Sequence, residues 1–286
     1  MAGYDLPADW PDTEFSQFID SAGLRWHVQV RGNGPDLLLL HGTGASSHSW
    51  VPMARLLSSD FRVIAPDLPG QGFTELAPAP QCSLAGMSRA IGGLLNDLHA
   101  DPRVIVGHSA GAAIAASLCL RGSFNPQAIV SINGAMLPFG RAAAPVFSKA
   151  AQLLAASPVF TQLVALHAVP RKPVERMLRQ TGSSTPEEMV RCYRQLLGNP
   201  RHVAATLRMM ASWDLEQLEV NLDRLHPSLS LLVCDNDSVV LPEQGEELAR
   251  RVPGSALHRI EGLGHLGHEE NPEWFANQVR SVFRPE

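Results

Sequence analysis

A serine flanked by glycines is the strongest chemical signal in the sequence. The pentapeptide at 107–111, Gly-His-Ser-Ala-Gly, follows the apolar run 104–106 and precedes the small-residue run 112–120. This pattern predicts a sharp turn between a strand and a helix, a nucleophile elbow with Ser109 at its apex. Both glycines are needed because side chains there would collide with the adjacent strand and helix. We therefore predict that Ser109 is a nucleophile.

A histidine must activate this serine, because an unaided hydroxyl is a weak nucleophile near neutral pH. His265 is our candidate, since it lies in the glycine-rich segment 262–267, just beyond the last predicted strand. His268 is the competitor, and we interpret it as a packing or capping residue near the start of the final helix. A metal site at His265 and His268 would lack a third ligand at a supporting spacing, so no metal is predicted.

An acid must in turn orient the histidine. Asp237 follows the apolar run 229–233, which predicts that it lies at the same sheet edge as Ser109. Asp235 is the alternative, but an acid at a strand end is typical of turns. Asp237 comes 128 residues after Ser109 and 28 residues before His265. The first interval leaves room for an inserted domain, and the second for one helix and one strand.

Two backbone N–H groups are expected to form an oxyanion hole. One belongs to Ala110, which follows the nucleophile, and the other to Thr43 in the His-Gly-Thr-Gly segment 41–44. Such donors stabilise the charge that develops on a carbonyl oxygen under attack. Outside a catalytic context the segment 41–44 would be an ordinary glycine turn. We interpret His108 as a structural or pocket-lining residue, and Asp67 as an organiser of the loop at 67–74.

Apolar runs alternate with helical patterns along most of the chain, which favours a doubly wound, mostly parallel α/β sheet. The predicted strands cover 24–31, 37–40, 61–65, 104–106, 128–132, 229–233 and 256–260. The predicted helices cover 50–57, 84–98, 110–120, 243–251 and 272–282.

The alternation stops between about residues 135 and 224, where we find helical patterns but no convincing strand. The clearest cover 174–180, 186–197 and 200–212. We predict a helical cap at 135–224, inserted into a core made of 1–134 and 225–286; a run of ordinary crossover helices is the alternative. The cap also offers apolar side chains that line a substrate pocket or form the cap's own core: Phe139, Phe147, Phe160, Met209, Met210 and Trp213.

Composition excludes several classes of protein. The chain has 286 residues, 45% hydrophobic and 18% charged, with a net charge of −5. This charge, without a Lys/Arg cluster, argues against nucleic-acid binding. We find no signal peptide and no apolar run long enough to span a membrane. The four cysteines lack metal-site spacing and predict reduced buried thiols. A cytoplasmic location is therefore expected.

Together these motifs resemble the α/β-hydrolase superfamily across nearly the whole chain. A narrower resemblance, from about residue 23 onward, is to the BchO family of magnesium-chelatase accessory hydrolases in bacteriochlorophyll synthesis. The segments that carry it are 41–50, 107–115, 133–139, 209–215 and 262–270. It implies an α/β-hydrolase fold with a helical cap and a role in that pathway. The chain has no phosphate-binding GxxxxGK[ST] loop, so it would not insert the metal alone.

The function expected from these observations is that of a serine hydrolase cleaving an ester of an apolar substrate, without a cofactor. A tetrapyrrole ester, or the ester of its hydrophobic alcohol, would suit the apolar cap residues. One alternative is a binding protein on the same fold, holding a porphyrin or docking on chelatase subunits. Another is different chemistry with the same residues, such as C–C bond hydrolysis or perhydrolysis.

Overall fold

A single eight-stranded sheet organises the protein. The computed structural model describes residues 6–138, 157–168 and 170–284. The strands run in the order β1-β2-β4-β3-β5-β6-β7-β8. The first two strands are antiparallel to their neighbours and all later pairs are parallel. The strands are β1 (Ser16–Ser21), β2 (Leu24–Arg31), β3 (Asp36–Leu40), β4 (Arg62–Pro66), β5 (Pro102–His108), β6 (Ala128–Ile132), β7 (Ser228–Cys234) and β8 (Ala256–Ile260).

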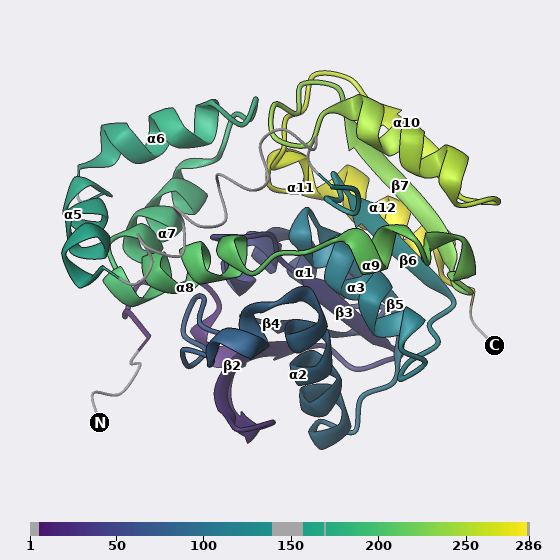
Figure 1. The fold of residues 1–286 in the computed structure, drawn as a ribbon, viewed down its shortest axis with the longest axis horizontal. Coiled ribbons are helices and arrows are strands. Elements are labelled where there is room, and N and C mark those ends of the chain that lie inside the picture. The colour runs from purple at the N-terminus through teal and green to yellow at the C-terminus, as the bar shows by residue number, and fades with distance from the viewer. Residues whose placement is uncertain (1–5, 139–156, 169, 285–286) are drawn as a thin grey trace.

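Helices cover both faces of this sheet (Figure 1). One apolar cluster joins the sheet to α2 (Leu84–Asp97), α3 (Ala110–Leu120) and α10 (Pro242–Arg251). A second cluster joins the opposite face to α1 (Val51–Leu57) and α12 (Pro272–Val282). Strands β3, β5 and β6 are largely apolar and buried because both of their faces are covered. The predicted doubly wound, mostly parallel sheet is therefore confirmed.

Two strands differ from expectation. β1 was not predicted; it pairs antiparallel with β2, and only Ser21 in it is buried. β8 was expected to be buried like the central strands, but none of its residues is buried. The reason is its position at the sheet edge, where Arg259 forms ion pairs with Asp235 and Glu246 instead of packing into a core.

Between β6 and β7 the described residues form helices and no strand. They are α5 (Pro158–Ala168), α6 (Arg171–Arg179), α7 (Glu187–Leu197), α8 (Pro200–Ala211) and the short α9 (Glu216–Glu219). The bounds of α6, α7 and α8 agree with the sequence prediction to within a few residues, whereas α5 and α9 were not predicted. In Figure 1, α5 to α8 lie together beside the carboxyl ends of the strands. The cap limits 135–224 stay a prediction.

The remaining elements are short. They are α11 (Gly267–Glu270) and the 3-10 helices Thr13–Phe15, Ser47–Trp50, Ala79–Cys82 and Leu222–Arg224. All four cysteines are free; Cys119 is half-buried and the other three are buried. Among the described residues, no helix is long and apolar enough to cross a membrane.

Candidate active site

Ser109 occupies a strained turn at the carboxyl end of β5. Its backbone has φ 51° and ψ −117°, a conformation that non-glycine residues rarely adopt. Backbone hydrogen bonds hold it there: its N–H donates to Ile132 over 3.0 Å, and its carbonyl accepts from Ala112 and Ala135. The predicted strand–turn–helix geometry is present, and Ser109 directly precedes α3.

The two glycines around the turn are needed for different reasons. A Cβ at Gly107 would lie 2.4 Å from the nitrogen of Ala112 in α3. A Cβ at Gly111 would lie 2.1 Å from the carbonyl oxygen of Leu40 in β3. Both contacts are with backbone, which cannot move aside without shifting the helix or the strand. The predicted steric requirement is therefore confirmed at both positions.

Asp237 and His265 meet at the same edge of the sheet. The carboxylate Oδ2 of Asp237 accepts a 2.7 Å hydrogen bond from Nδ1 of His265. Its other oxygen, Oδ1, accepts from the backbone N–H groups of Val239 and Val240 at 2.7 and 2.9 Å. These bonds fix the carboxylate, which in turn orients the ring of His265 through Nδ1. Asp235, the alternative acid, is engaged with Arg259 instead.

The backbone of His265 is anchored from three directions. Its carbonyl accepts from Nε2 of His108 at 2.9 Å and from Nδ2 of Asn133 at 3.0 Å. Its N–H donates to the carbonyl of Thr181, in the turn between α6 and α7. The inserted helical segment therefore contacts the histidine loop directly.

Asn133 also ties this loop to β7, which leads into Asp237. Its Nδ2 donates to Gly264 as well as to His265, and its Oδ1 accepts from the N–H of Cys234. In Asn133→Asp a carboxylate oxygen would face two carbonyl oxygens. We expect the free energy of unfolding to fall by about 2–4 kcal/mol, because a buried hydrogen-bond donor becomes a charged acceptor.

Urea denaturation would measure this change. Asn277→Asp is the matched control, because Asn277 is exposed and its Oδ1 only accepts from Arg280. The control should unfold like the wild type. Equal stability of Asn133→Asp and Asn277→Asp would show that the Asn133 bridge is dispensable.

The predicted oxyanion-hole segments lie on either side of Ser109. Ala110 is the first residue of α3, so its N–H has no acceptor within the helix. Across the site, a Cβ at Gly42 would lie 3.1 Å from the Cβ of Ser109, which brings the Gly42–Thr43 segment against the nucleophile. The helix N-terminus adds a favourable dipole for negative charge at this point.

Buried polar side chains hold the 41–44 segment in place. His41 donates through Nδ1 to the Gly42 carbonyl and accepts at Nε2 from the Leu68 N–H. Asp67 accepts from the N–H groups of Ser47 and Phe73 and pairs with His27, which confirms its predicted role as a loop organiser.

Helix α8 reaches the same loops. Met209 contacts Thr43, with 3.7 Å between its Sδ and the threonine Oγ1. His202 accepts from the Gly72 N–H at Nδ1, and its Nε2 donates to the Gly44 carbonyl. Met209, one of the predicted substrate-binding residues, therefore contacts the predicted oxyanion segment.

Two further predicted pocket residues, Met210 and Trp213, have different surroundings. Met210 is 47% exposed on the outer side of α8, and Trp213 packs against the main core cluster. His108 is buried, with its ring between those of His265 and His268, and its structural or pocket-lining role stays a prediction. Phe139 and Phe147 lie outside the described residues.

A second buried polar cluster lies behind the histidine loop. The hydroxyls of Ser49 and of Tyr193 in α7 both donate to Oε1 of Glu269, and Ser49 also contacts Nε2 of His268. Burial raises the pKa of Glu269 to about 7 and lowers that of His268 to about 3. His268 thus has a packing role, as predicted. The cluster joins the inserted helices to the core beneath the site.

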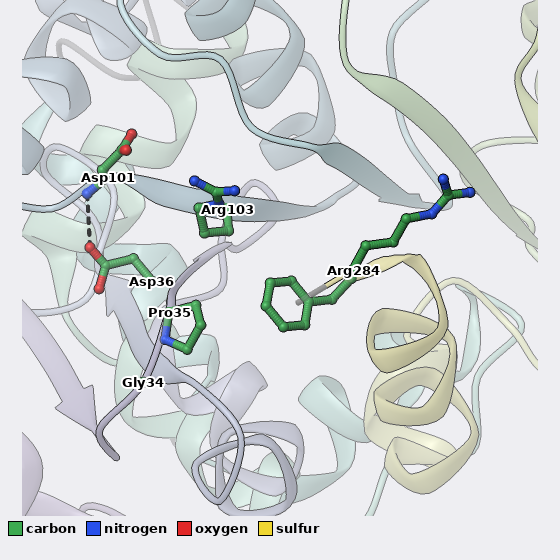
Figure 2. A pocket seen from close by; sticks show the side chains of 7 residues that line it. Gly34, Pro35, Asp36, Asp101, Arg103 and Arg284 are labelled. Atoms are coloured by element: carbon green, nitrogen blue, oxygen red, sulfur yellow. Dashed lines mark hydrogen bonds between the residues drawn. The ribbon is translucent and has the colours of Figure 1, made fainter. Parts of the chain in front are cut away.

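The cavity in Figure 2 is at the wrong end of the sheet for this chemistry. It has a volume of about 630 Å³ and lies where β3 and β5 begin, whereas Ser109 follows the end of β5. Figure 2 shows Asp36 there accepting a hydrogen bond from the backbone N–H of Asp101. Within the described parts of the chain, no group of three metal-ligating side chains is present.

Sequence reasoning missed the residues that hold the triad candidates from behind. Asn133 had a signal, because it directly follows a buried strand whose end faces the site. The 181–183 turn had no such signal, since it is distant in sequence. A Cβ at Gly264 would lie 2.2 Å from the carbonyl carbon of Gly182, so the two turns pack glycine against glycine.

Comparison with known proteins agrees with this fold and site geometry. The sequence model of the Alpha/beta hydrolase family matches residues 37–278, and the chain belongs to this family. A relative from Rhodobacter capsulatus, the magnesium-chelatase 30 kDa subunit, is 37% identical over 92% of this chain and 93% of its own. The narrower resemblance to the BchO family is thereby confirmed.

Other relatives carry hydrolase names. The pimeloyl-[acyl-carrier protein] methyl ester esterase of Vibrio atlanticus is 29% identical over 90% of this chain and 97% of its own. An α/β-hydrolase fold protein from Burkholderia ambifaria superimposes with a TM-score of 0.77 at 25% identity, covering 93% of this chain and 99% of the other. These likenesses support a hydrolase and leave the bond that is cleaved to be determined.

Proposed function

We propose that this protein is a serine hydrolase that cleaves an ester of an apolar substrate with Ser109, His265 and Asp237. The observation that carries the proposal is the 2.7 Å bond between Asp237 and Nδ1 of His265. This bond leaves Nε2 as the nitrogen able to take a proton from the serine. The strained turn that presents Ser109 beside Gly42 and α3 supports the same assignment.

The reaction follows from these positions. The Oγ of Ser109 attacks the ester carbonyl carbon while its proton passes to Nε2 of His265. The N–H groups of Ala110 and Thr43 stabilise the negative oxygen of the tetrahedral intermediate. The carbon–oxygen bond to the alcohol then breaks, and His265 returns the proton to the leaving oxygen. Water, deprotonated by His265, then attacks the carbonyl carbon of the acyl-enzyme; the bond from that carbon to the Oγ of Ser109 breaks, His265 returns the proton to Oγ, and the acid is released.

We infer an apolar acyl or alcohol group from the side chains close to the oxyanion segment. Met209 contacts Thr43, and it is buried rather than exposed to solvent. Methionine adapts to irregular apolar ligands because its side chain is flexible and polarizable. Together with the name of the Rhodobacter relative, this favours an ester of a magnesium tetrapyrrole as the physiological substrate.

Fluorophosphonate labelling followed by intact-mass analysis would test the proposal. We expect a single adduct on the wild type, mapped to Ser109 and absent from Ser109→Ala and His265→Ala. Ser238→Ala is a suitable control, because Ser238 is exposed next to Asp237 and its hydroxyl only donates to a backbone carbonyl. This control should label like the wild type. An unlabelled, folded wild type would contradict an activated serine.

The name of the Rhodobacter relative favours a second candidate, a non-catalytic accessory protein that holds a porphyrin or docks on chelatase subunits. Fluorescence titration with a magnesium porphyrin would separate the two functions. Tight binding that is unchanged in Ser109→Ala, without ester turnover by the wild type, would favour the accessory role. Turnover of simple p-nitrophenyl esters by the wild type would favour the hydrolase.

A further inference from the structure

Helix α5 exposes its large apolar side chains and buries its small ones, the opposite of an ordinary surface helix. Its large apolar residues Val159, Leu163 and Leu166 are 70%, 59% and 57% exposed. Their i, i+4, i+7 spacing places them on one face of the helix. The opposite face, which is buried against the protein, carries the smaller residues Thr161, Ala165 and Ala168. Packing among the described residues therefore does not account for the three large side chains.

The apolar surface continues onto α6. Met177 is 41% exposed, and it lines a groove of about 350 Å³ between the two helices. Val164 and Leu197 contribute apolar surface to the same groove. We call Val159, Leu163, Leu166 and Met177, with this groove, the α5–α6 face. In Figure 1 both helices lie at the outer edge of the molecule, away from the sheet.

Positive charge surrounds the α5–α6 face. Lys172 and Arg176 are exposed and line the groove, as does His167. Neither Lys172 nor Arg176 forms an ion pair with another described residue. Helix α6 carries four basic residues and one glutamate, in a chain whose net charge is −5. Arg171 and Arg179 form ion pairs with Glu175, and Arg171 also pairs with Glu187, so Lys172 and Arg176 supply the excess charge. This local excess of positive charge runs against the charge of the whole protein.

We propose that the α5–α6 face docks on an anionic lipid surface. Exposed aliphatic side chains flanked by lysine and arginine suit the boundary between headgroups and acyl chains, where the apolar groups insert and the cations meet lipid phosphates. A second copy of the chain fits less well, because a symmetric dimer through this face would bring the two sets of cations together. This inference does not depend on the proposed hydrolase activity.

Vesicle co-sedimentation of the full-length chain would test the proposal. We expect binding to vesicles of phosphatidylcholine with phosphatidylglycerol, weaker binding at high salt, and little binding to phosphatidylcholine alone. The double variant Leu163→Ser/Leu166→Ser should bind at least tenfold more weakly. The double variant Lys172→Ala/Arg176→Ala should also lose binding, by about fivefold for each cation removed.

The matched control replaces equally exposed apolar residues elsewhere. Val220 and Leu241 are 67% and 53% exposed, and both lie outside the α5–α6 face. The double variant Val220→Ser/Leu241→Ser should bind vesicles like the wild type. Absence of wild-type binding to the anionic vesicles would overturn the proposal, as would equal losses in the test and control variants. A dimer in sedimentation analysis that Leu163→Ser/Leu166→Ser abolishes, without vesicle binding, would identify a self-association surface instead.

Discussion

Replacing Ser109 by alanine is expected to lower kcat for a p-nitrophenyl ester by about 10⁴-fold or more. The substitution removes the hydroxyl that we propose as the nucleophile, while the Asp237–His265 bond and the segments of the proposed oxyanion hole stay in place. Some rate above that in water should remain, since the oxyanion hole and substrate binding still act. Stopped assays with enzyme freed of wild-type contamination would measure the residual rate.

The His265→Ala variant sharpens this test. Because nucleophile and base act as one unit, His265→Ala should cost about as much as Ser109→Ala, and the double variant little more. Ser238→Ala should stay within about twofold of the wild type, because its hydroxyl contacts neither the nucleophile nor the base. If Ser109→Ala kept a tenth of the wild-type kcat, another group would have to be the nucleophile.

Acid is expected to unfold this protein at an unusually mild pH. Burial lowers the pKa of His48 and His268 to about 3 and that of His202 to about 4. Burial also lowers the pKa of His41 and His108. The geometry agrees, because His41 and His202 each accept a backbone N–H through a ring nitrogen that protonation would block.

The sign of the effect follows from proton linkage. Below pH 6.5 the unfolded chain binds protons at these histidines and the folded protein does not, so stability falls as the pH falls. For His48, His202 and His268 the loss at pH 5 is about 2 kcal/mol each. Glu269 acts in the opposite direction: its raised pKa of about 7 gives stability that is gained as the pH falls from 7 towards 4.5. The offset at pH 5 is about 3 kcal/mol.

The histidines outnumber the single carboxyl group, so the net loss should be several kcal/mol, a large part of a typical folding free energy. Urea midpoints measured from pH 8 to 4.5 would show this. Glu269→Gln removes the opposing group and should make the fall between pH 7 and 5 steeper. His202→Asn keeps a hydrogen-bond acceptor but has no titrating ring, so the fall in stability between pH 7 and 5 should be smaller in this variant. A urea midpoint that stays constant from pH 7 to 5 would refute the prediction.

The fold class and the candidate catalytic residues could both be predicted from the amino-acid sequence. Glycine is required at 107 and 111, since a Cβ at either position would lie within 2.5 Å of a backbone atom. The central strands could be predicted because strands buried on both faces consist of continuous apolar runs. The order Ser109, Asp237, His265 followed from where those strands end, because parallel strands bring their carboxyl ends to one edge.

The surroundings of those residues depend on the three-dimensional packing of distant segments. The sequence of β8 resembles that of a buried strand, but β8 lies at the edge of the sheet and is not buried. The local sequence pattern does not show how many neighbouring strands a strand has. The anchoring of His265 by Thr181, the cluster at Glu269 and the reversed amphipathicity of α5 all depend on contacts between segments distant in sequence. Such contacts produce no periodic pattern in the sequence, because they join individual residues of distant segments.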